Sequence, residues 1–172
     1  MPGPGAGVGI REAGPQDADL LANVVHRIAA HYEEGLAEPP DVTADRLRRL
    51  RIGPDGLVQA LIAEQDDRVV GAAFFNVQFP GADALPCLYL KDLYVDPTAR
   101  RSGIAQALLS RLAALTLERG FERLDWSTDS ANTAAMALYD GIGAALLDSK
   151  RFWRLDRTAL RRLTDAGTAT QV

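Results

Sequence analysis

The segment from Leu88 to Ala114 constrains the fold more than any other part of the chain. It begins with a run of strand-forming residues, Leu88 to Val95, which Asp96-Pro97 ends. A helical pattern starts at Ile104, because apolar residues at positions 104, 108, 112 and 115 share one helix face. The segment therefore predicts a strand, a loop and the N-terminus of a helix, in that order.

The loop between this strand and this helix has the properties of an anion cradle. The first turn of a helix leaves its backbone N–H groups without partners, and the helix dipole favours negative charge there. Gly103 lets a ligand approach the backbone closely, and Ala105 keeps the next inward position small. Arg100 and Arg101 add positive charge, so a diphosphate is the ligand that suits this loop best. The alternative is a basic, solvated turn that opens an ordinary helix.

Length and composition favour one globular domain. The chain has 172 residues, of which 47% are hydrophobic and 24% are charged, as is usual for a soluble protein. We expect a flexible N-terminus at residues 1–7, a single domain at 8–157 and a C-terminal tail at 158–172. The net charge of −4 argues against nucleic-acid binding through bulk positive charge.

Few residues are available for a disulfide or a metal site. Cys87 is the single cysteine, so no intrachain disulfide can form. The two histidines, His26 and His31, are five positions apart and do not share a helix face, so each is interpreted as a surface or capping residue. No apolar run reaches membrane-spanning length and no signal peptide is recognisable, so we expect no membrane partner and a cytoplasmic location.

The N-terminal part of the chain predicts a strand and two helices. The strand is expected at 8–11, and Pro15 and Asp17 open a helix that ends near Glu34 and Gly35. Thr43 is the predicted N-cap of a short helix at 44–52. This short helix carries four arginines, which we interpret as a solvated face; the alternative is a contact with ligand phosphates or with a partner chain.

The remaining signals predict a mixed sheet. Two strands are expected at 57–63 and 68–79 around Asp66-Asp67, followed by a break at Pro80-Gly81 and a central strand at 87–95. A helix closed by Arg119-Gly120, a strand at 121–127 and a helix at 130–139 ended by Gly141 to Gly143 come next. The chain is expected to finish with a hairpin of 144–148 with 151–155 and a short terminal helix or frayed tail after Asp156. A helix between two strands favours parallel pairing of those strands, whereas the earlier strands form an antiparallel hairpin. The pattern indicates an α/β (α+β) fold.

Two motifs resemble those of the GCN5-related N-acetyltransferases, the GNAT family. Arg100 to Ala105 fits the family's Arg/Gln-x-x-Gly-x-Gly/Ala signature. Asn132-x-x-Ala135-x-x-x-Tyr139, followed by Gly143, fits its second motif. The resemblance covers roughly Val8 to Leu155. It implies the GNAT fold, with a mixed central sheet of about six to seven strands flanked by helices, and it implies acetyl-CoA as co-substrate without a metal.

The resemblance also implies roles for individual residues. In the family, the loop and helix start hold the coenzyme diphosphate, and a backbone N–H of the splayed central strand polarises the thioester carbonyl. The residues implied to contact the coenzyme are Leu93, Tyr94, Val95, Arg100, Arg101, Ser102, Gly103, Ile104, Ala105, Gln106 and Asn132. Tyr139 is implied to protonate the leaving thiolate. Judged alone, Asn132 would be a helix N-cap and Tyr139 a half-buried core residue.

A closer resemblance is to the diamine (spermidine/spermine-type) and thialysine acetyltransferases. It rests on Tyr89 to Val95, Leu124 to Trp126 and Arg151 to Leu155. That group has a glutamate, acting as a base through water, where this chain has Lys91. A lysine cannot replace that base at its ordinary pKa and would repel a polycation, so Lys91 is expected to pair with a carboxylate on the substrate.

The neighbouring Asp92 is expected to bind the substrate amine or to act as the base, with Asp129 and Glu33 as reserve candidates. Lys91 and Asp92 are expected on opposite faces of the strand, because side chains alternate along a strand. Members of this closer group are commonly dimers, so the resemblance implies a homodimer.

Together these features predict an acetyl-CoA-dependent N-acetyltransferase acting on a primary amine of a small molecule, such as a diamine, a polyamine or an amino-acid-like amine. Direct attack in a ternary complex is the expected mechanism. One alternative is an enzyme that acetylates protein lysines or N-termini. The other is a non-catalytic module that binds acyl-CoA or regulates a partner.

Overall fold

The computed structural model describes residues 7–32, 36–79 and 84–168. The chain falls into two compact units, Met1–Ala131 and Asn132–Val172, and each is described by itself. The prediction of one domain over 8–157 stays a prediction. Several predicted features lie outside the described residues: the flexible N-terminus apart from Gly7, the helix end at Glu34 and Gly35, the reserve candidate Glu33 and the break at Pro80-Gly81.

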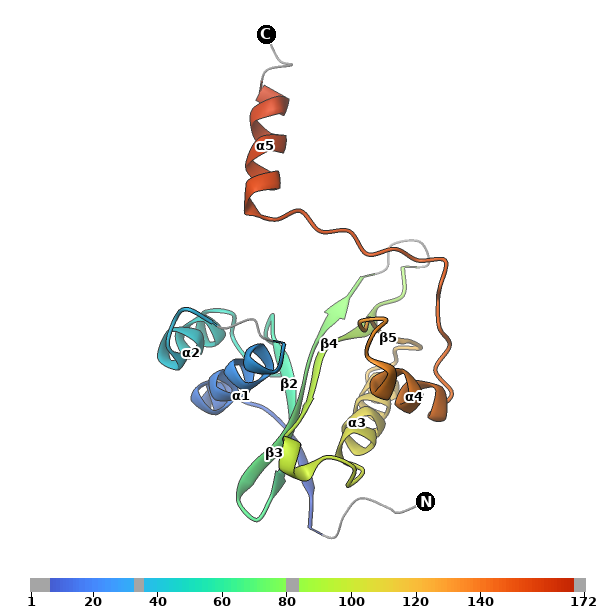
Figure 1. The fold of residues 1–172 in the computed structure, drawn as a ribbon. Coiled ribbons are helices and arrows are strands. Elements are labelled where there is room, and N and C mark those ends of the chain that lie inside the picture. The colour runs from blue at the N-terminus through green and yellow to red at the C-terminus, as the bar shows by residue number, and fades with distance from the viewer. Residues whose placement is uncertain (1–6, 33–35, 80–83, 169–172) are drawn as a thin grey trace. The chain divides into compact units, whose positions relative to one another are not determined.

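Five strands form one mixed sheet in the first unit. The strands are β1 (Gly9–Glu12), β2 (Gln59–Gln65), β3 (Arg68–Gln78), β4 (Cys87–Val95) and β5 (Leu124–Trp126), in the spatial order β1-β2-β3-β4-β5 (Figure 1). Neighbouring strands are antiparallel except β4 and β5, which are parallel. The α/β (α+β) fold with a mixed sheet flanked by helices is therefore confirmed, and so are the central strand at 87–95 and its parallel partner.

Helices cover both faces of this sheet. The first unit holds η1 (Pro15–Asp17), α1 (Ala18–His31), α2 (Pro40–Arg49), η2 (Pro97–Ala99) and α3 (Ile104–Glu118). Figure 1 shows α1 and α2 on one face and α3 on the other. Alternation along β2 explains this arrangement, because Ile62 packs in the α1–α2 core while its neighbours Leu61 and Ala63 are buried toward the opposite face.

A close approach between β3 and β4 holds α3 near the sheet. A Cβ atom added at Gly71 would lie 2.9 Å from the carbonyl oxygen of Tyr94 and 3.0 Å from Cγ2 of Ile104. Ile104 is the first residue of α3. The absence of a side chain at position 71 therefore sets how closely the start of α3 approaches β4.

The hairpin between β2 and β3 agrees with the predicted turn. Asp66 and Asp67 both have positive φ angles, 50° and 57°. A two-residue hairpin turn of type I′ requires this conformation at both positions, and Asp tolerates it better than most residues.

The second helix starts earlier than predicted. α2 begins at Pro40, so Thr43 lies buried inside its first turn, and its predicted role as N-cap is wrong. Proline at the first helical position presets the helical φ angle, and here this preference determines the helix start more strongly than a threonine N-cap does. The Thr43 hydroxyl instead lies 3.1 Å from Nε2 of His26, which joins α2 to α1.

The arginines of α2 are largely neutralised. Arg46 pairs with Glu38, and Arg48 lies 2.5 Å from Asp19 and 2.9 Å from Asp45. These pairs support the interpretation of this helix as a solvated face.

The second unit contains α4 (Thr133–Gly141) and α5 (Arg157–Thr168). The terminal helix was one of the two predicted outcomes and is present. The predicted final hairpin is wrong, because residues 144–155 form no strand, and the sheet of the described part of the chain has five strands, fewer than predicted. Strand-forming residues do not fold as strands unless a partner supplies the hydrogen bonds.

An ion network fixes the start of α1 to the sheet edge. Arg11 of β1 donates to both carboxylate oxygens of Asp17, at 2.9 and 2.8 Å, and to Glu64 of β2 at 2.9 Å. The Asp17 carboxylate also accepts the backbone N–H of Gly14 and is only 7% exposed. The Arg11 hydrogen bonds hold the pKa of Asp17 below its usual value, against the opposing effect of burial.

We expect Asp17→Asn to lower the free energy of unfolding at pH 7 by about 2 kcal/mol, the size of a hydrogen bond to a charged group. Because the folded pKa of Asp17 is lowered, its stabilisation is complete above the unfolded pKa of about 3.9 and is lost as pH falls through the folded pKa. Urea unfolding at pH 7 and below pH 4 measures both effects. Asp67→Asn, at an exposed turn, is the matched control; an equal loss in both variants would contradict the prediction.

Candidate active site

The edge of β4 that faces β5 is only partly paired. β4 and β5 pair at Leu88 with Leu124, Tyr89 with Asp125, and Leu90 with Trp126, and β5 then ends. Beyond Leu90 no strand of the described residues pairs with this edge of β4. The backbone of residues 91–95 is therefore open to a ligand on this side.

Strand alternation identifies which amides face the open edge. The N–H of Asp96 bonds to the carbonyl of Val70 in β3, so the N–H of Tyr94 also points toward β3. The N–H groups of Leu93 and Val95 then point to the open edge. Of the three strand residues predicted to contact a coenzyme, Leu93 and Val95 offer free donors, while the Tyr94 side chain is buried in the core.

A β-bulge lies where the two strands separate. Phe74 pairs with Asp92 and Phe75 with Leu90, so Lys91 has no partner on β3. The alternation rule behind the expected opposite orientations of Lys91 and Asp92 does not extend across a bulge. Asp92 shares the α1–α2 face with Phe74, because directly paired residues lie on the same face.

Lys91 and Asp92 are both available for a ligand. Lys91 is exposed and Asp92 is half-buried. Within the described part of the chain, neither side chain forms a hydrogen bond or an ion pair. An ammonium group and a carboxylate are thus adjacent at the point where β4 and β5 diverge.

The predicted anion cradle is formed by the start of α3. Gly103 caps the helix with a φ of 85°, a conformation that favours glycine, and the space where its Cβ would lie is empty. The first helical hydrogen bond runs from the N–H of Ala107 to the carbonyl of Gly103. The N–H groups of Ile104, Ala105 and Gln106 have no partner among the described residues and can bind an anion.

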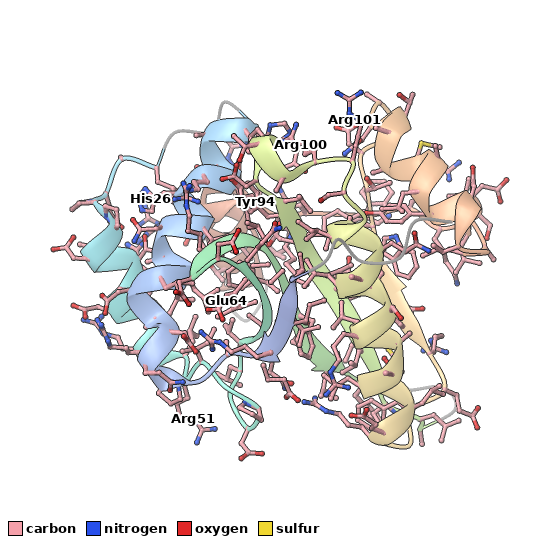
Figure 2. The ribbon with its side chains drawn as sticks, turned by 90° about the horizontal axis from the view of Figure 1, so that it is seen from below. His26, Arg51, Glu64, Tyr94, Arg100 and Arg101 are labelled. Atoms are coloured by element: carbon pink, nitrogen blue, oxygen red, sulfur yellow. The ribbon has the colours of Figure 1, made fainter. Side chains whose placement is uncertain are left out.

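Two exposed arginines precede this helix on the same loop. Arg101 has a φ of 61°, and Arg100 donates from Nε to the carbonyl of Val95 at 3.4 Å. Ser102 donates to the carbonyl of Ala99 at 2.5 Å. Figure 2 shows both arginines at the loop.

Asp96 shapes the beginning of the loop. Its carboxylate accepts the N–H and the hydroxyl of Thr98, at 3.0 and 2.6 Å, and lies 3.5 Å from Arg27 of α1. The hydrogen bonds from Thr98 are the main reason why the pKa of Asp96 is lowered. This residue links the loop to α1, a contact that the sequence analysis missed because it depends on residues far apart in the chain.

The second motif lies in the second unit. The Asn132 side chain accepts the N–H of Ala135 at 3.1 Å and so caps α4, as expected for asparagine at this position. Tyr139 lies two turns further along α4, and Gly143 follows the helix with a φ of 83°. Their roles toward a coenzyme stay predictions.

Among the other candidates, Asp129 accepts the N–H of Ala131 at 2.8 Å, and His31 ends α1 with its ring against Tyr32. The hydroxyls of Tyr89 and Ser127 lie 3.0 Å apart, a contact that the sequence does not predict. The residue types of this pair do not indicate the contact, because it depends on the register of β4 and β5. No group of three or more His, Cys, Asp or Glu side chains within the described ranges is arranged to hold a metal ion. No helix in the described part of the chain is long and apolar enough to span a membrane.

Comparison with known proteins agrees with this geometry. Residues 23–144 match the model of the acetyltransferase (GNAT) family. The chain is similar to a thialysine N-epsilon-acetyltransferase of Caenorhabditis elegans, with 29% identity over 88% of this chain and 93% of the relative. A mycothiol acetyltransferase of Salinispora tropica is 32% identical over 77% of this chain, but that match spans only 42% of the relative.

Solved structures share the fold. An integron cassette protein from the mobile metagenome of V. cholerae has a TM-score of 0.81 and 28% identity, with coverage of 93% of this chain and 99% of that one. An aminoglycoside N-acetyltransferase solved in complex with CoA has a TM-score of 0.70 and 17% identity, over 86% and 94% of the two chains, which shows likeness of fold alone. The family match spans well over half of the sequence. The chain therefore belongs to the GNAT family of acetyltransferases and is an acyltransferase.

Proposed function

We propose that this protein transfers the acetyl group of acetyl-CoA to the primary amine of a small, amino-acid-like molecule by direct attack in a ternary complex. One observation carries the proposal: three unpartnered N–H groups at the start of α3 adjoin a β4 edge that no strand covers. A diphosphate fits the N–H groups at the start of α3, and a ligand with a chain of amide groups fits the uncovered β4 edge.

The residues present fit the coenzyme. Arg100, Arg101 and the amides from Gly103 to Gln106 would hold its diphosphate, and Leu93 and Val95 would bond to the amides of its pantetheine arm. When bound, the coenzyme supplies an acetyl group activated as a thioester. An N–H of the open β4 edge would stabilise negative charge on the carbonyl oxygen during attack.

The acceptor amine must lose a proton before it can attack. An alkylammonium has a pKa of about 10, so a carboxylate or a water chain is needed near pH 7. We assign this role to Asp92, which lies on the α1–α2 face of β4 beside the bulge. The thiolate that leaves has a pKa of about 8.5 when protonated, and we assign Tyr139 as the acid that protonates it.

Lys91 points to a substrate that carries a carboxylate. It is exposed at the bulge, next to Asp92, so the two side chains match the opposite charges of an amino acid. The similar proteins from Caenorhabditis elegans and Arabidopsis thaliana are named for thialysine and L-ornithine, both amino acids with a side-chain amine. These names support an amino-acid-like acceptor over a polyamine.

The alternatives have less support. Docking of a protein substrate on the basic helix α2 is weakened, because Arg46 and Arg48 are already paired with acidic residues. A non-catalytic module is suggested only by Lys91 at the usual glutamate position. An amine panel separates small-molecule acetylation from both alternatives, and mass spectrometry of acetylated proteins separates the two alternatives from each other.

We also propose that the protein forms a homodimer, as the closer resemblance implies. Large apolar side chains are exposed in the second unit, including Phe152 at 72% and Trp153 at 89%. Burial of these side chains against a second copy would remove their apolar surface from water.

Replacement of Tyr139 by Phe is expected to lower kcat at least tenfold at pH 7 while leaving the Kd for acetyl-CoA within about twofold, because only proton donation is lost. Steady-state kinetics and calorimetric titration of acetyl-CoA measure the two quantities. Tyr32→Phe, at an exposed tyrosine, is the control. Unchanged turnover in Tyr139→Phe would make this tyrosine structural, and no coenzyme binding by the wild type would refute the transferase proposal.

Matched substrates test the role of Lys91. L-Ornithine and putrescine differ by the carboxylate, so the wild-type protein is expected to favour L-ornithine in kcat/KM. Lys91→Met should reduce that preference by about tenfold, the effect of losing one charged pair, and Lys91→Glu should reverse it. The same ratio of the two substrates in all three proteins, or equal turnover of polyamines by wild type and Lys91→Glu, would contradict this assignment.

Size-exclusion chromatography with light scattering tests the dimer. The wild-type protein is expected to elute with twice the chain mass, and the double variant Phe152→Ser with Trp153→Ser is expected to dissociate. Leu117→Ser removes an equally exposed apolar side chain from α3 and serves as the control, with no expected change. A monomeric wild type at all concentrations would refute the proposal.

A further inference from the structure

A cavity lies beside the anion cradle, on the side of α1. It has a volume of about 660 Å³ and is lined by residues of α1, the β2–β3 turn and the loop from Asp96 to Ser102. None of the residues from Gly103 to Gln106, which form the cradle, lines it. Figure 2 shows Arg100 on the α1 side of the loop. The cavity is thus next to the coenzyme cradle without sharing its amide donors.

Three arginines from three separate elements line this cavity: Arg27 of α1, Arg68 at the start of β3, and Arg100 of the loop. We call this site the arginine pocket. Two acidic residues, Asp66 and Asp96, also line it, so positive charge is in excess.

The excess positive charge is concentrated on Arg68 and Arg100. Asp96 already accepts two hydrogen bonds from Thr98 and pairs with Arg27 at 3.5 Å. Arg68 is close enough to contribute to the lowered pKa of Asp96, but it forms no ion pair with the described residues. Arg100 donates only to the backbone carbonyl of Val95 and has no carboxylate partner in the described ranges. The guanidinium groups of Arg68 and Arg100 are therefore available to an anion, with the Asp66 carboxylate offsetting one of the two charges.

The rest of the lining mixes polar side chains, from Asn23, Gln65, Thr98 and Ser102, with apolar ones. Leu20 and Val24 of α1 and Val69 of β3 contribute to the wall of the cavity. Guanidinium groups bind carboxylate and phosphate oxygens through paired hydrogen bonds, and an apolar wall favours a ligand with a hydrocarbon body. Inorganic ions alone would leave this wall uncovered.

We propose that the arginine pocket binds the phosphate or carboxylate group of a small organic anion, at a site on the α1 side of the loop that shares Arg100, but none of the amide donors, with the coenzyme cradle. The loop from Asp96 to Ser102 is common to both sites, since Gly103 follows it directly. An anion that orders this loop should therefore change the affinity of the cradle for its own ligand, and the coupling must be reciprocal. Only this coupling rests on the proposed function; binding of the anion does not.

Calorimetric titration of the full chain with phenyl phosphate, benzoate and inorganic phosphate tests the proposal. Phenyl phosphate or benzoate is expected to bind the wild-type protein more tightly than inorganic phosphate, and the tighter of the two identifies the anionic group. Arg68→Gln should weaken that binding about tenfold, as expected for loss of a charged hydrogen-bond donor, whereas Arg27→Gln should weaken it less, because Arg27 already pairs with Asp96. Arg49→Gln, on the exposed part of α2 and outside the cavity, is the matched control and should bind as the wild type does.

Binding of neither organic anion, equal binding of inorganic phosphate, or unchanged binding in both pocket variants would overturn the proposal. The titration is then repeated with acetyl-CoA at saturation. Binding of both ligands together, with a shifted affinity, supports two coupled sites, whereas displacement of the organic anion would place it in the cradle and overturn the separate site. If acetyl-CoA does not bind, the proposed function fails, while the first titration still decides on the arginine pocket.

Discussion

The unequal pairing of β4 is the constraint on which the candidate site depends. On one side β4 is paired with β3 along its length, apart from the bulge, and on the other it is paired with β5 only from Leu88 to Leu90. The first side holds the strand rigidly in the core, and the second leaves backbone donors exposed. A site built this way needs few specialised side chains, because the backbone supplies the donors and the sheet fixes their direction.

Charge around this strand is arranged in separate local groups. The network of Arg11 holds the start of α1, and Asp96 ties the loop to α1 through Arg27. Neither group faces Lys91 and Asp92, which lie unpaired at the bulge. In the described part of the chain, these structural ion pairs therefore leave free the two charged residues that we propose to contact the acceptor.

Local signals in the sequence were sufficient for the central elements. The range of β4 and the start of α3 agree with prediction, because a strand-forming run, Asp96-Pro97 and Gly103 all act over a few residues. Features that depend on pairing between distant segments were not predictable. The bulge at Lys91 follows from its register with Phe74 and Phe75, and residues 144–155 have strand-forming types but no partner strand. The arginine pocket combines three elements that are distant in sequence, so no sequence motif predicts it.

Gly71 shows how a residue outside the candidate site can control it. It has no side chain to offer a ligand, yet the carbonyl of Tyr94 and the side chain of Ile104 would meet any atom added there. In directed evolution, a substitution at position 71 is therefore expected to change the spacing between the β4 edge and the α3 terminus without altering any residue of the site. Selection for acceptance of bulkier acyl donors should consider this internal position as well as the residues that line the site.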